Sequence, residues 1–495
     1  MSTPWDALKE RNEELDALGG ASALLEWDQQ TTMPEGAAAS RGRQATALGK
    51  LLHQRAVEPV IGEWIAALDA GPLDATQTAA VRLAGRRYRR ATCIPSSLVE
   101  ALTEARHVAF HAWMEARRAD DFSAFEAPLQ RLIDLVRQQV DCYGYADHPY
   151  DALLEDYDPG STVAALRPMF TRLGDELRTF LAAIEGRPHP ADWSPALDID
   201  GQKRLSARVL TDLGFDKTRG RLDVSEHPFT IGLDPTDVRI TTHYRGPSFV
   251  ASLGGTVHEA GHGLYEQGLR TDRPGTGLDR AAGMGLHESQ SRFWENFIGR
   301  SRPFCAYLAP RMAGIWPDLA IDPDVVYGAL NRVERSLIRV QADEATYNLH
   351  ILARFELELG VVEGRLQAAD LPAAWDEAYR RHVGVVAERP SEGVLQDVHW
   401  SGGLFGYFPS YTIGNLWAAS LGATIEAALP TLWDDVAAGR FGGVLGWLRE
   451  HVHRRGAEVD APDIIRDAVG DRDAVSDFVD HLWRRHGALY GVSRG

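Results

Sequence analysis

The chain has 495 residues, about three times the usual length of a domain, so we expect either several domains or one large body. A hydrophobic fraction of 44% and a charged fraction of 25% exclude a largely disordered protein. The formal net charge of −18 argues against a surface for nucleic acids or anionic membranes. We therefore expect a globular protein that binds neither nucleic acid nor membrane.

The cysteines and the N-terminal residues indicate the compartment. Cys93, Cys142 and Cys305 are far apart and form no CxxC pair, so neither a disulfide framework nor a thiolate zinc site is expected. The first residues do not show the basic stretch and apolar run of a signal peptide. We therefore expect a cytoplasmic protein.

Apolar residues recur at helical spacing through most of the chain to about residue 220. Between His227 and Tyr244 apolar and polar residues instead alternate, which predicts a small β-hairpin. Helical spacing returns over 331–359, where Val333, Leu337 and Val340 are among the apolar positions, and predicts another long helix.

A glycine-rich helix is predicted after the hairpin, beginning at Gly246-Pro247 and ending near Gln267. Each glycine inside a helix costs about 1 kcal/mol relative to alanine, unless its small size permits close packing. We therefore expect another element to press against this helix, and Val238 and Ile240 of the hairpin are the candidates. The glycines are Gly254, Gly255, Gly261 and Gly263.

The run from His258 to His262 on this helix is an HExxH motif. Two histidines four residues apart lie on one face, near enough to share a metal ion. Glu259 is offset by one residue, so its carboxylate can reach a metal-bound water without being a ligand, as a general base does. The alternative is that the histidines only pack or cap the helix.

A catalytic zinc ion needs a third protein ligand. A metzincin would have a histidine where this chain has Gly268. Glu288 opens the next amphipathic stretch and is the predicted ligand. Glu266 competes on spacing, but three successive ligands along one helix would surround a tetrahedral ion poorly.

Six ordered runs make the sequence similar to the carboxypeptidase Taq family of zinc metallocarboxypeptidases. The resemblance extends over the whole chain, from Trp27 through Tyr150–Leu154 to His453. The six runs are His227 to Phe229, Asp237 to Thr241, His258 to His262, His287 to Gln290, Ile338 to Asp343, and Gly393 to Trp400.

The resemblance implies a mainly α, two-lobed helical metallopeptidase, with a deep central cleft and a small antiparallel β-sheet beside the HExxH helix. We expect one peptidase domain over 1–495. Within it, 1–220 would flank the cleft, 221–420 would carry the zinc and substrate segments, and 421–495 would form C-terminal helices.

The resemblance also implies one Zn²⁺ per chain, held by His258, His262 and Glu288, with Co²⁺ as an ion that could replace it. Glu259 would be the catalytic glutamate. Peptides with a free C-terminus would be the substrates, cleaved with broad specificity to release single amino acids, and the protein would be a homodimer. In other glutamate-zinc peptidases an aspartate lies four residues after the third ligand. Arg292 stands there, so the partners of the ligand imidazoles stay unassigned.

The reaction needs donors for the oxyanion and for the terminal carboxylate. By resemblance to related helical peptidases, His399 and Tyr411 would contact the oxyanion or the substrate backbone, and Tyr407 of the same glycine-rich stretch would bind substrate. The alternative for each is packing within a loop. Arg339 is predicted to bind the carboxylate, because a guanidinium matches it in bidentate fashion. Its alternative is an ion pair with Asp343.

Strand alternation places Asp237, Arg239 and Thr241 on one side, so Arg239 is a further predicted substrate contact. Alternatively, Asp237 and Arg239 pair with each other. Two other functions stay open: an endopeptidase with the same zinc site, and a non-catalytic peptide-binding protein. The intact Glu259 argues against the second, because a binding protein needs no base.

Overall fold

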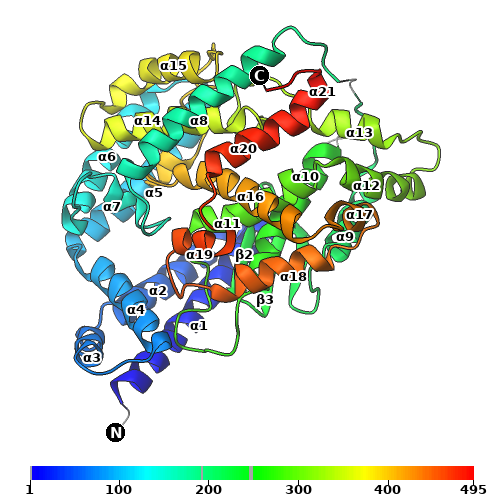
Figure 1. Cartoon of the computed structure of the whole chain (residues 1–495). Helices are drawn as coiled ribbons and strands as arrows, with labels where there is room; N and C mark the ends of the chain where they lie inside the picture. The colour runs from blue at the N-terminus through cyan, green and yellow to red at the C-terminus, as the bar shows by residue number, and fades with distance from the viewer. Residues whose placement is uncertain (1–2, 191–192, 245–248, 495) are drawn as a thin grey trace.

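Two hydrophobic cores organise the helices of the chain, and Figure 1 shows how these helices are arranged. The computed structural model describes residues 3–190, 193–244 and 249–494. The first core lies among α5 (Ser96–Ala119), α6 (Ser123–Tyr143), α7 (Asp151–Leu154), α8 (Val163–Ile184), α14 (Tyr347–Val362), α15 (Leu371–His382), α20 (Ala474–Leu482) and α21 (Ala488–Tyr490). The second lies among α9 (Ile199–Asp212), α10 (Phe249–Glu266), α11 (Met284–Arg292), α12 (Arg302–Ile315), α13 (Pro323–Leu330), α17 (Leu432–Ala437), α18 (Gly442–His451) and α19 (Ala461–Val469).

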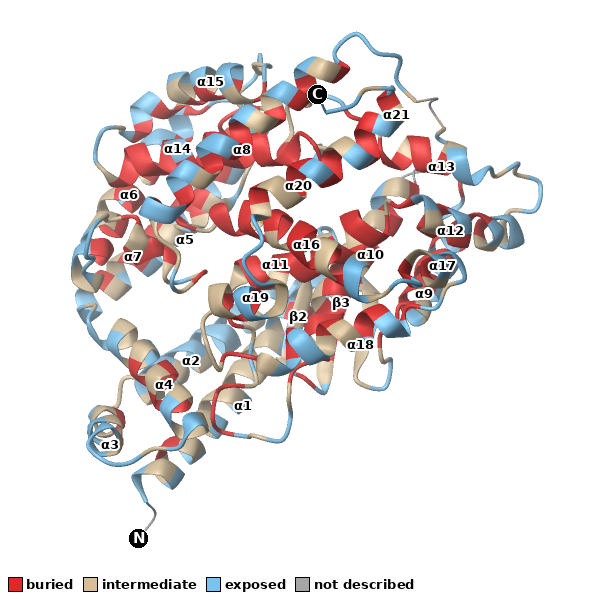
Figure 2. Ribbon diagram, in the orientation of Figure 1, coloured by how far each residue is buried: buried red, intermediate tan, exposed pale blue. Residues whose placement is uncertain are grey.

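One helix, α16 (Pro409–Ala428), belongs to both cores. Ile413 and Leu416 pack in the first core, whereas Leu421 and Ile425 pack in the second. Buried residues are accordingly concentrated along α8, α10, α11 and α16 (Figure 2). The mainly helical architecture implied by the resemblance is confirmed.

The N-terminal helices form a smaller group at one side of the molecule (Figure 1). They are α1 (Pro4–Thr31), α2 (Ala38–Ala56), α3 (Pro59–Asp69) and α4 (Ala75–Thr92). Leu8, Ile61, Val81 and Ala84 make a small core of their own, and α2 has no buried residue. None of the helices in the described part of the chain is both long and apolar enough to cross a bilayer.

The sheet has the strand order β1-β3-β2, with β1 (Gly220–Val224), β2 (Thr230–Asp234) and β3 (Asp237–Thr242). β2 and β3 form the predicted hairpin, but β1 pairs with β3 in parallel, so the sheet is mixed rather than purely antiparallel. Val238 and Ile240 are fully buried, and a Cβ on Gly263 of α10 would lie 3.0 Å from Ile240 Cγ2. The predicted packing of this strand against the glycine-rich helix is confirmed. The predicted helix start at Gly246-Pro247 lies outside the described residues.

The predicted helix over 331–359 is wrong in its first half. α13 ends at Leu330, a single turn covers Arg339–Gln341, and α14 begins only at Tyr347. The cause is the Asp343 carboxylate, which accepts hydrogen bonds from the backbone N–H groups of Glu334, Ala345 and Thr346. Such side-chain bonds occupy backbone N–H groups before α14 and compete with helix formation there.

Candidate metal centre and substrate site

Two glycines bring the helices of the site together. A Cβ on Gly261 of α10 would lie 2.6 Å from Gln290 O and from Ser291 Cα of α11. A Cβ on Gly414 of α16 would lie 2.6 Å from both Cβ and Cγ of Glu288. Because glycine has no Cβ, α11 fits between the two helices, and this brings Glu288 to the HExxH face.

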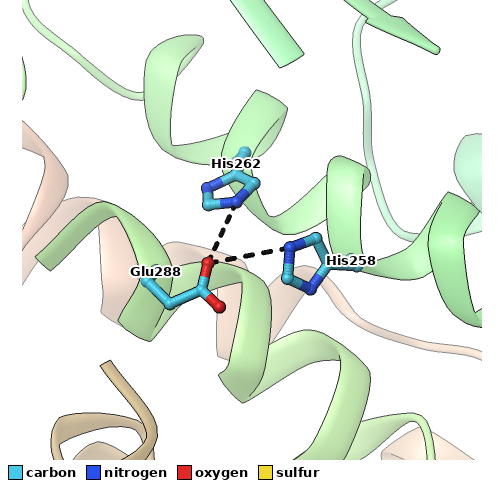
Figure 3. A group of neighbouring side chains, drawn as sticks. All are labelled: His258, His262 and Glu288. Atoms are coloured by element: carbon cyan, nitrogen blue, oxygen red, sulfur yellow. Dashed lines mark ion pairs between the residues drawn. The ribbon is translucent and has the colours of Figure 1, made fainter. Parts of the chain in front are cut away.

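His258, His262 and Glu288 converge as predicted (Figure 3). Glu288 Oε2 lies 3.7 Å from His258 Nε2 and 3.3 Å from His262 Nε2, and one candidate ligand atom of each residue lies within 4.8 Å of the others. A tetrahedral zinc ion with ligands at about 2.0–2.2 Å separates those ligands by about 3.3–3.6 Å. Two imidazoles and a carboxylate at these spacings fit such an ion.

A chain of hydrogen bonds orients the ring of His262. His287 Nδ1 lies 2.5 Å from His262 Nδ1, and His287 Nε2 lies 2.7 Å from Glu266 Oε1. If His262 Nε2 binds metal, its Nδ1–H donates to His287, whose Nε2–H donates to Glu266. Glu266, the competing third ligand, therefore lies behind the ligand ring. Burial and the neighbouring His287 lower the pKa of His262 to about 3, which keeps this ring neutral.

His258 has a carboxylate partner of its own, since its Nδ1 lies 2.9 Å from Glu295 Oε2. Arg292 joins the two acidic residues: its Nε donates to Glu288 Oε1 at 2.7 Å and its Nη1 to Glu295 Oε2 at 3.2 Å. Burial alone would raise the pKa of Glu288, but Arg292 and His258 hold it well below its usual range. Arg292 thus keeps Glu288 ionised, whereas an aspartate at this position would have repelled it.

Glu259 directly follows the candidate ligand His258 on α10, and its side chain is buried, with only 6% of the residue exposed. Its Oε2 accepts a hydrogen bond from Thr230 Oγ1 of β2 at 2.7 Å, whereas Oε1 has no hydrogen-bond partner among the described residues. Burial raises the pKa of Glu259. A buried carboxylate of raised pKa beside a metal site suits a group that must accept and then return a proton.

The predicted oxyanion residues also come together. His399 Nε2 lies 3.2 Å from the Tyr411 hydroxyl, and the Tyr407 ring lies 5.3 Å from the Tyr411 ring. Burial, aided by the charges of Arg339 and Arg354, lowers the pKa of His399 to about 3. A neutral His399 can donate its Nε2–H to Tyr411, which leaves the Tyr411 hydroxyl proton for a further acceptor.

A buried glutamate holds the loop between His399 and Tyr407. Glu358 of α14 accepts hydrogen bonds from Trp400 Nε1 at 2.8 Å, from Gly406 N at 3.0 Å and from the Tyr150 hydroxyl at 2.5 Å. Burial raises the pKa of Glu358 to about 7 even though all three bonds lower it.

Arg339 is buried but does not pair with Asp343, the predicted alternative. Its Nε and Nη2 donate to Asp397 Oδ1 at 3.0 and 2.8 Å, and its Nη1 donates to the Tyr347 hydroxyl at 2.8 Å. Arg354 binds the other carboxylate oxygen of Asp397 at 2.5 Å. A guanidinium has five N–H groups and these bonds use three, so one on Nη1 and one on Nη2 make no hydrogen bond within the described part of the chain.

Arg239 lies elsewhere. Its Nε and Nη2 donate to the two carboxylate oxygens of Asp237 at 3.0 and 2.9 Å, and its guanidinium lies 4.4 Å from the centre of the Trp27 ring. The structure therefore places this residue in the pairing that the sequence left as its alternative.

Sequence reasoning missed the residues that orient the ligands. Glu295 was findable in principle, because it follows Glu288 by seven residues and so lies two turns further along the same face. Asp397 lies in the run from Gly393 to Trp400, but the sequence alone indicates no role for it. Nothing in the sequence links Asp397 to Arg339, since their contact joins segments 58 residues apart.

Comparisons with known proteins show the family to which the sequence and the fold are similar. The family model described as carboxypeptidase Taq (M32) metallopeptidase matches residues 7–486. The chain is 41% identical to thermostable carboxypeptidase 1 of Thermus thermophilus, over 98% of this chain and 99% of that protein. It is 37% identical to thermostable carboxypeptidase 1 of Pyrococcus furiosus, over 92% of this chain and 93% of that protein. The crystal structure of an M32 carboxypeptidase from Deinococcus radiodurans R1 superposes with a TM-score of 0.96 at 38% identity, over 99% of this chain and 100% of that chain.

Proposed function

The chain belongs to the carboxypeptidase Taq (M32) metallopeptidase family and is a metal-dependent carboxypeptidase, and we propose that a zinc ion held by His258, His262 and Glu288 serves its reaction. The observation that carries the proposal is that one candidate ligand atom of each of these three side chains lies within 4.8 Å of the others. The carboxylate of Glu259, which is not one of the candidate ligands, lies next to them on α10. Family membership favours the carboxypeptidase over the endopeptidase and the peptide-binding alternatives.

Glu259 is the proposed general base. When bound, zinc would act as a Lewis acid on the attacking water and the scissile carbonyl. Glu259 Oε1 takes the proton of the water, while Thr230 holds Oε2, and the same carboxyl group later donates the proton to the nitrogen of the leaving amine. The Tyr411 hydroxyl, supported by His399 Nε2, donates to the oxyanion.

Arg339 is the proposed reader of the terminal carboxylate. Its two remaining N–H groups can bind a carboxylate, and Asp397 and Tyr347 fix the guanidinium before substrate arrives. Tyr407 would border the same site through its contact with Tyr411. Arg239 already donates two hydrogen bonds to Asp237, so we propose no direct hydrogen bond from it to the substrate.

Several further properties belong to this proposal. We expect one zinc ion per chain, replaceable by Co²⁺, broad side-chain specificity and release of single amino acids. A reducing, cytoplasmic location is supported by three free cysteines. A homodimer rests on the family resemblance, and sedimentation of the purified protein tests it.

The decisive experiment compares one peptide as free acid and as C-terminal amide, each with and without chelator. We expect stepwise loss of C-terminal residues from the free acid only, abolition by chelator, and recovery with zinc or cobalt. Cleavage inside the amidated peptide would establish the endopeptidase instead. Binding of either peptide without cleavage at full zinc occupancy would establish the peptide-binding protein.

A further inference from the structure

The segment of residues 151–158, between α6 and α8, has no role in the site described so far. It ends in Asp158, which is 1% exposed and faces two helices at once. Its Oδ1 accepts a hydrogen bond from Gly285 N at 2.6 Å, and its Oδ2 accepts one from Ser410 Oγ at 2.5 Å. Each carboxylate oxygen therefore serves a different helix.

Both partners lie in the first turns of helices that carry the reaction. Gly285 precedes Glu288 by three residues on α11, and Ser410 directly precedes Tyr411 on α16. A carboxylate near helix N-termini is electrostatically favourable. Asp158 thus connects the helix of a proposed metal ligand to the helix of the proposed oxyanion donor.

Tyr157, next to Asp158, connects α11 to the segment just before α16. The carbonyl oxygen of Tyr157 accepts a hydrogen bond from Met284 N at 2.8 Å, and the Tyr157 ring lies edge-on to Tyr407 at 5.1 Å. The approach depends on small residues, because a Cβ on Gly283 or Gly285 would lie 3.0 or 2.9 Å from Asp158 Oδ1.

We propose that Asp158 is a positioning residue, which sets the placement of Glu288 relative to Tyr411 by binding the starts of α11 and α16. This inference rests on the proposed roles of those two residues. An amide at this position would keep an acceptor for Gly285 N–H, and the Ser410 hydroxyl could accept from the amide NH₂, so a neutral side chain should fulfil much of the role.

The two carboxylate oxygens of Asp158 bind different helices, so their effects on zinc affinity and on kcat should be separable. Asp158→Ala removes both contacts, so we expect kcat to fall about 10–100-fold and zinc affinity to fall about tenfold, with little change in KM. Ser410→Ala removes only the α16 contact, so kcat should fall while zinc affinity stays at the wild-type value. Asp158→Asn keeps an acceptor for Gly285 and should recover most of both properties.

Asp151 supplies a matched control from the same segment. Its Oδ1 accepts a hydrogen bond from Val163 N at 2.7 Å, at the start of α8, and so makes the same kind of contact to a helix outside the site. Asp151→Ala should lower the melting temperature as Asp158→Ala does, yet keep wild-type kcat and zinc affinity.

The measurements are kcat and KM on a free-acid peptide, zinc affinity by chelator competition, and Tm, with Glu288→Ala assayed in parallel. If Asp158→Ala behaves like Asp151→Ala while Glu288→Ala loses its zinc, Asp158 is merely structural and the inference is overturned. If Glu288→Ala keeps its zinc, the proposed metal site itself fails, and the inference fails with it.

Discussion

Gly261 of α10 faces Ser291 of α11 so closely that a Cβ on Gly261 would lie 2.6 Å from Ser291 Cα. The obstacle is backbone, so no side-chain rotation relieves it. Gly261, the one glycine of the HEAGH run, therefore sets the distance between α10 and α11, the helix that carries the third proposed ligand.

A methyl group at Gly261 should separate the two helices and move Glu288 away from the histidines. We expect Gly261→Ala to lose about 1–3 kcal/mol of unfolding free energy and most of its bound zinc. Gly254 of the same helix has nothing within 4 Å of an added Cβ. Gly254→Ala should instead stabilise the protein by up to about 1 kcal/mol with normal zinc content. Thermal melts and metal analysis of both variants test the contrast, and equal behaviour would contradict it.

The base assignment predicts a metal-loaded but inactive enzyme. Glu259→Gln keeps the size of the side chain and all three proposed ligands, yet its amide cannot accept the proton. We expect zinc content near that of wild type and kcat lower by about 10²–10⁴-fold. A variant that retains more than about a tenth of the wild-type rate would show that another group takes the proton.

Glu288 and Glu266, the two candidates for the third ligand, should differ in how much zinc affinity is lost when each is replaced. Glu288→Ala removes a proposed ligand, so dialysis should leave it nearly free of zinc. Glu266→Ala removes only the acceptor behind His287, so its zinc affinity should fall by about 10–100-fold without complete loss. Metal analysis after dialysis against graded chelator concentrations orders the two. The reverse order would place the metal site along α10 alone.

Arg339 should determine the preference for a free C-terminus. Its contact with the substrate carboxylate should be worth about 1.5–3 kcal/mol, or about 10–150-fold in kcat/KM. Arg339→Ala should therefore lose activity on the free acid but change little on the amide. Lysine should rescue partly, since it keeps the charge without the fork. Asp397 keeps Arg354 as a partner, so the fold should survive. An equal loss on both substrates would point to a role in positioning Asp397.

Glu358 should make stability depend on pH. Its pKa is about 7 in the folded protein against an ordinary 4.5, so between these values the folded chain keeps a proton that the unfolded chain has released. The unfolding free energy should therefore fall as pH rises from about 4.5 to 7, by on the order of 3 kcal/mol. In Glu358→Gln the unfolding free energy should no longer show this fall between pH 4.5 and 7. Its absolute stability should also be lower, because the amide NH₂ must face a donor such as Trp400 Nε1–H. Urea unfolding at pH 5, 6 and 7 measures both effects, and an unchanged slope would refute the assignment.

What the sequence predicted well depended on local periodicity. The HExxH helix follows from spacing, and the hairpin beside it follows from alternation and a turn. The contact of Ile240 with Gly263 was predictable because glycines inside a helix need a reason. The contact of Gly261 with α11 was not, since it depends on how a helix 30 residues away packs.

The helix predicted over 331–346 does not form, because a side chain binds backbone N–H groups that the helix would have used. The apolar spacing of Val333 and Val340 indicated a helix, but Asp343 captures nearby amides, and Val340 is 72% exposed. The partner of Arg339 was also out of reach, because 70 acidic residues compete and only the fold selects Asp397.

Because α16 packs in both hydrophobic cores, the two cores share one helix, and the helices around them should unfold as one cooperative unit. Zinc would be held on α10 and α11, and α11 packs against α16. Ligand binding stabilises every region that unfolds together with the site. Added zinc should therefore slow amide hydrogen exchange not only around His262 but also in α5 and α6, whose buried residues lie in the other core.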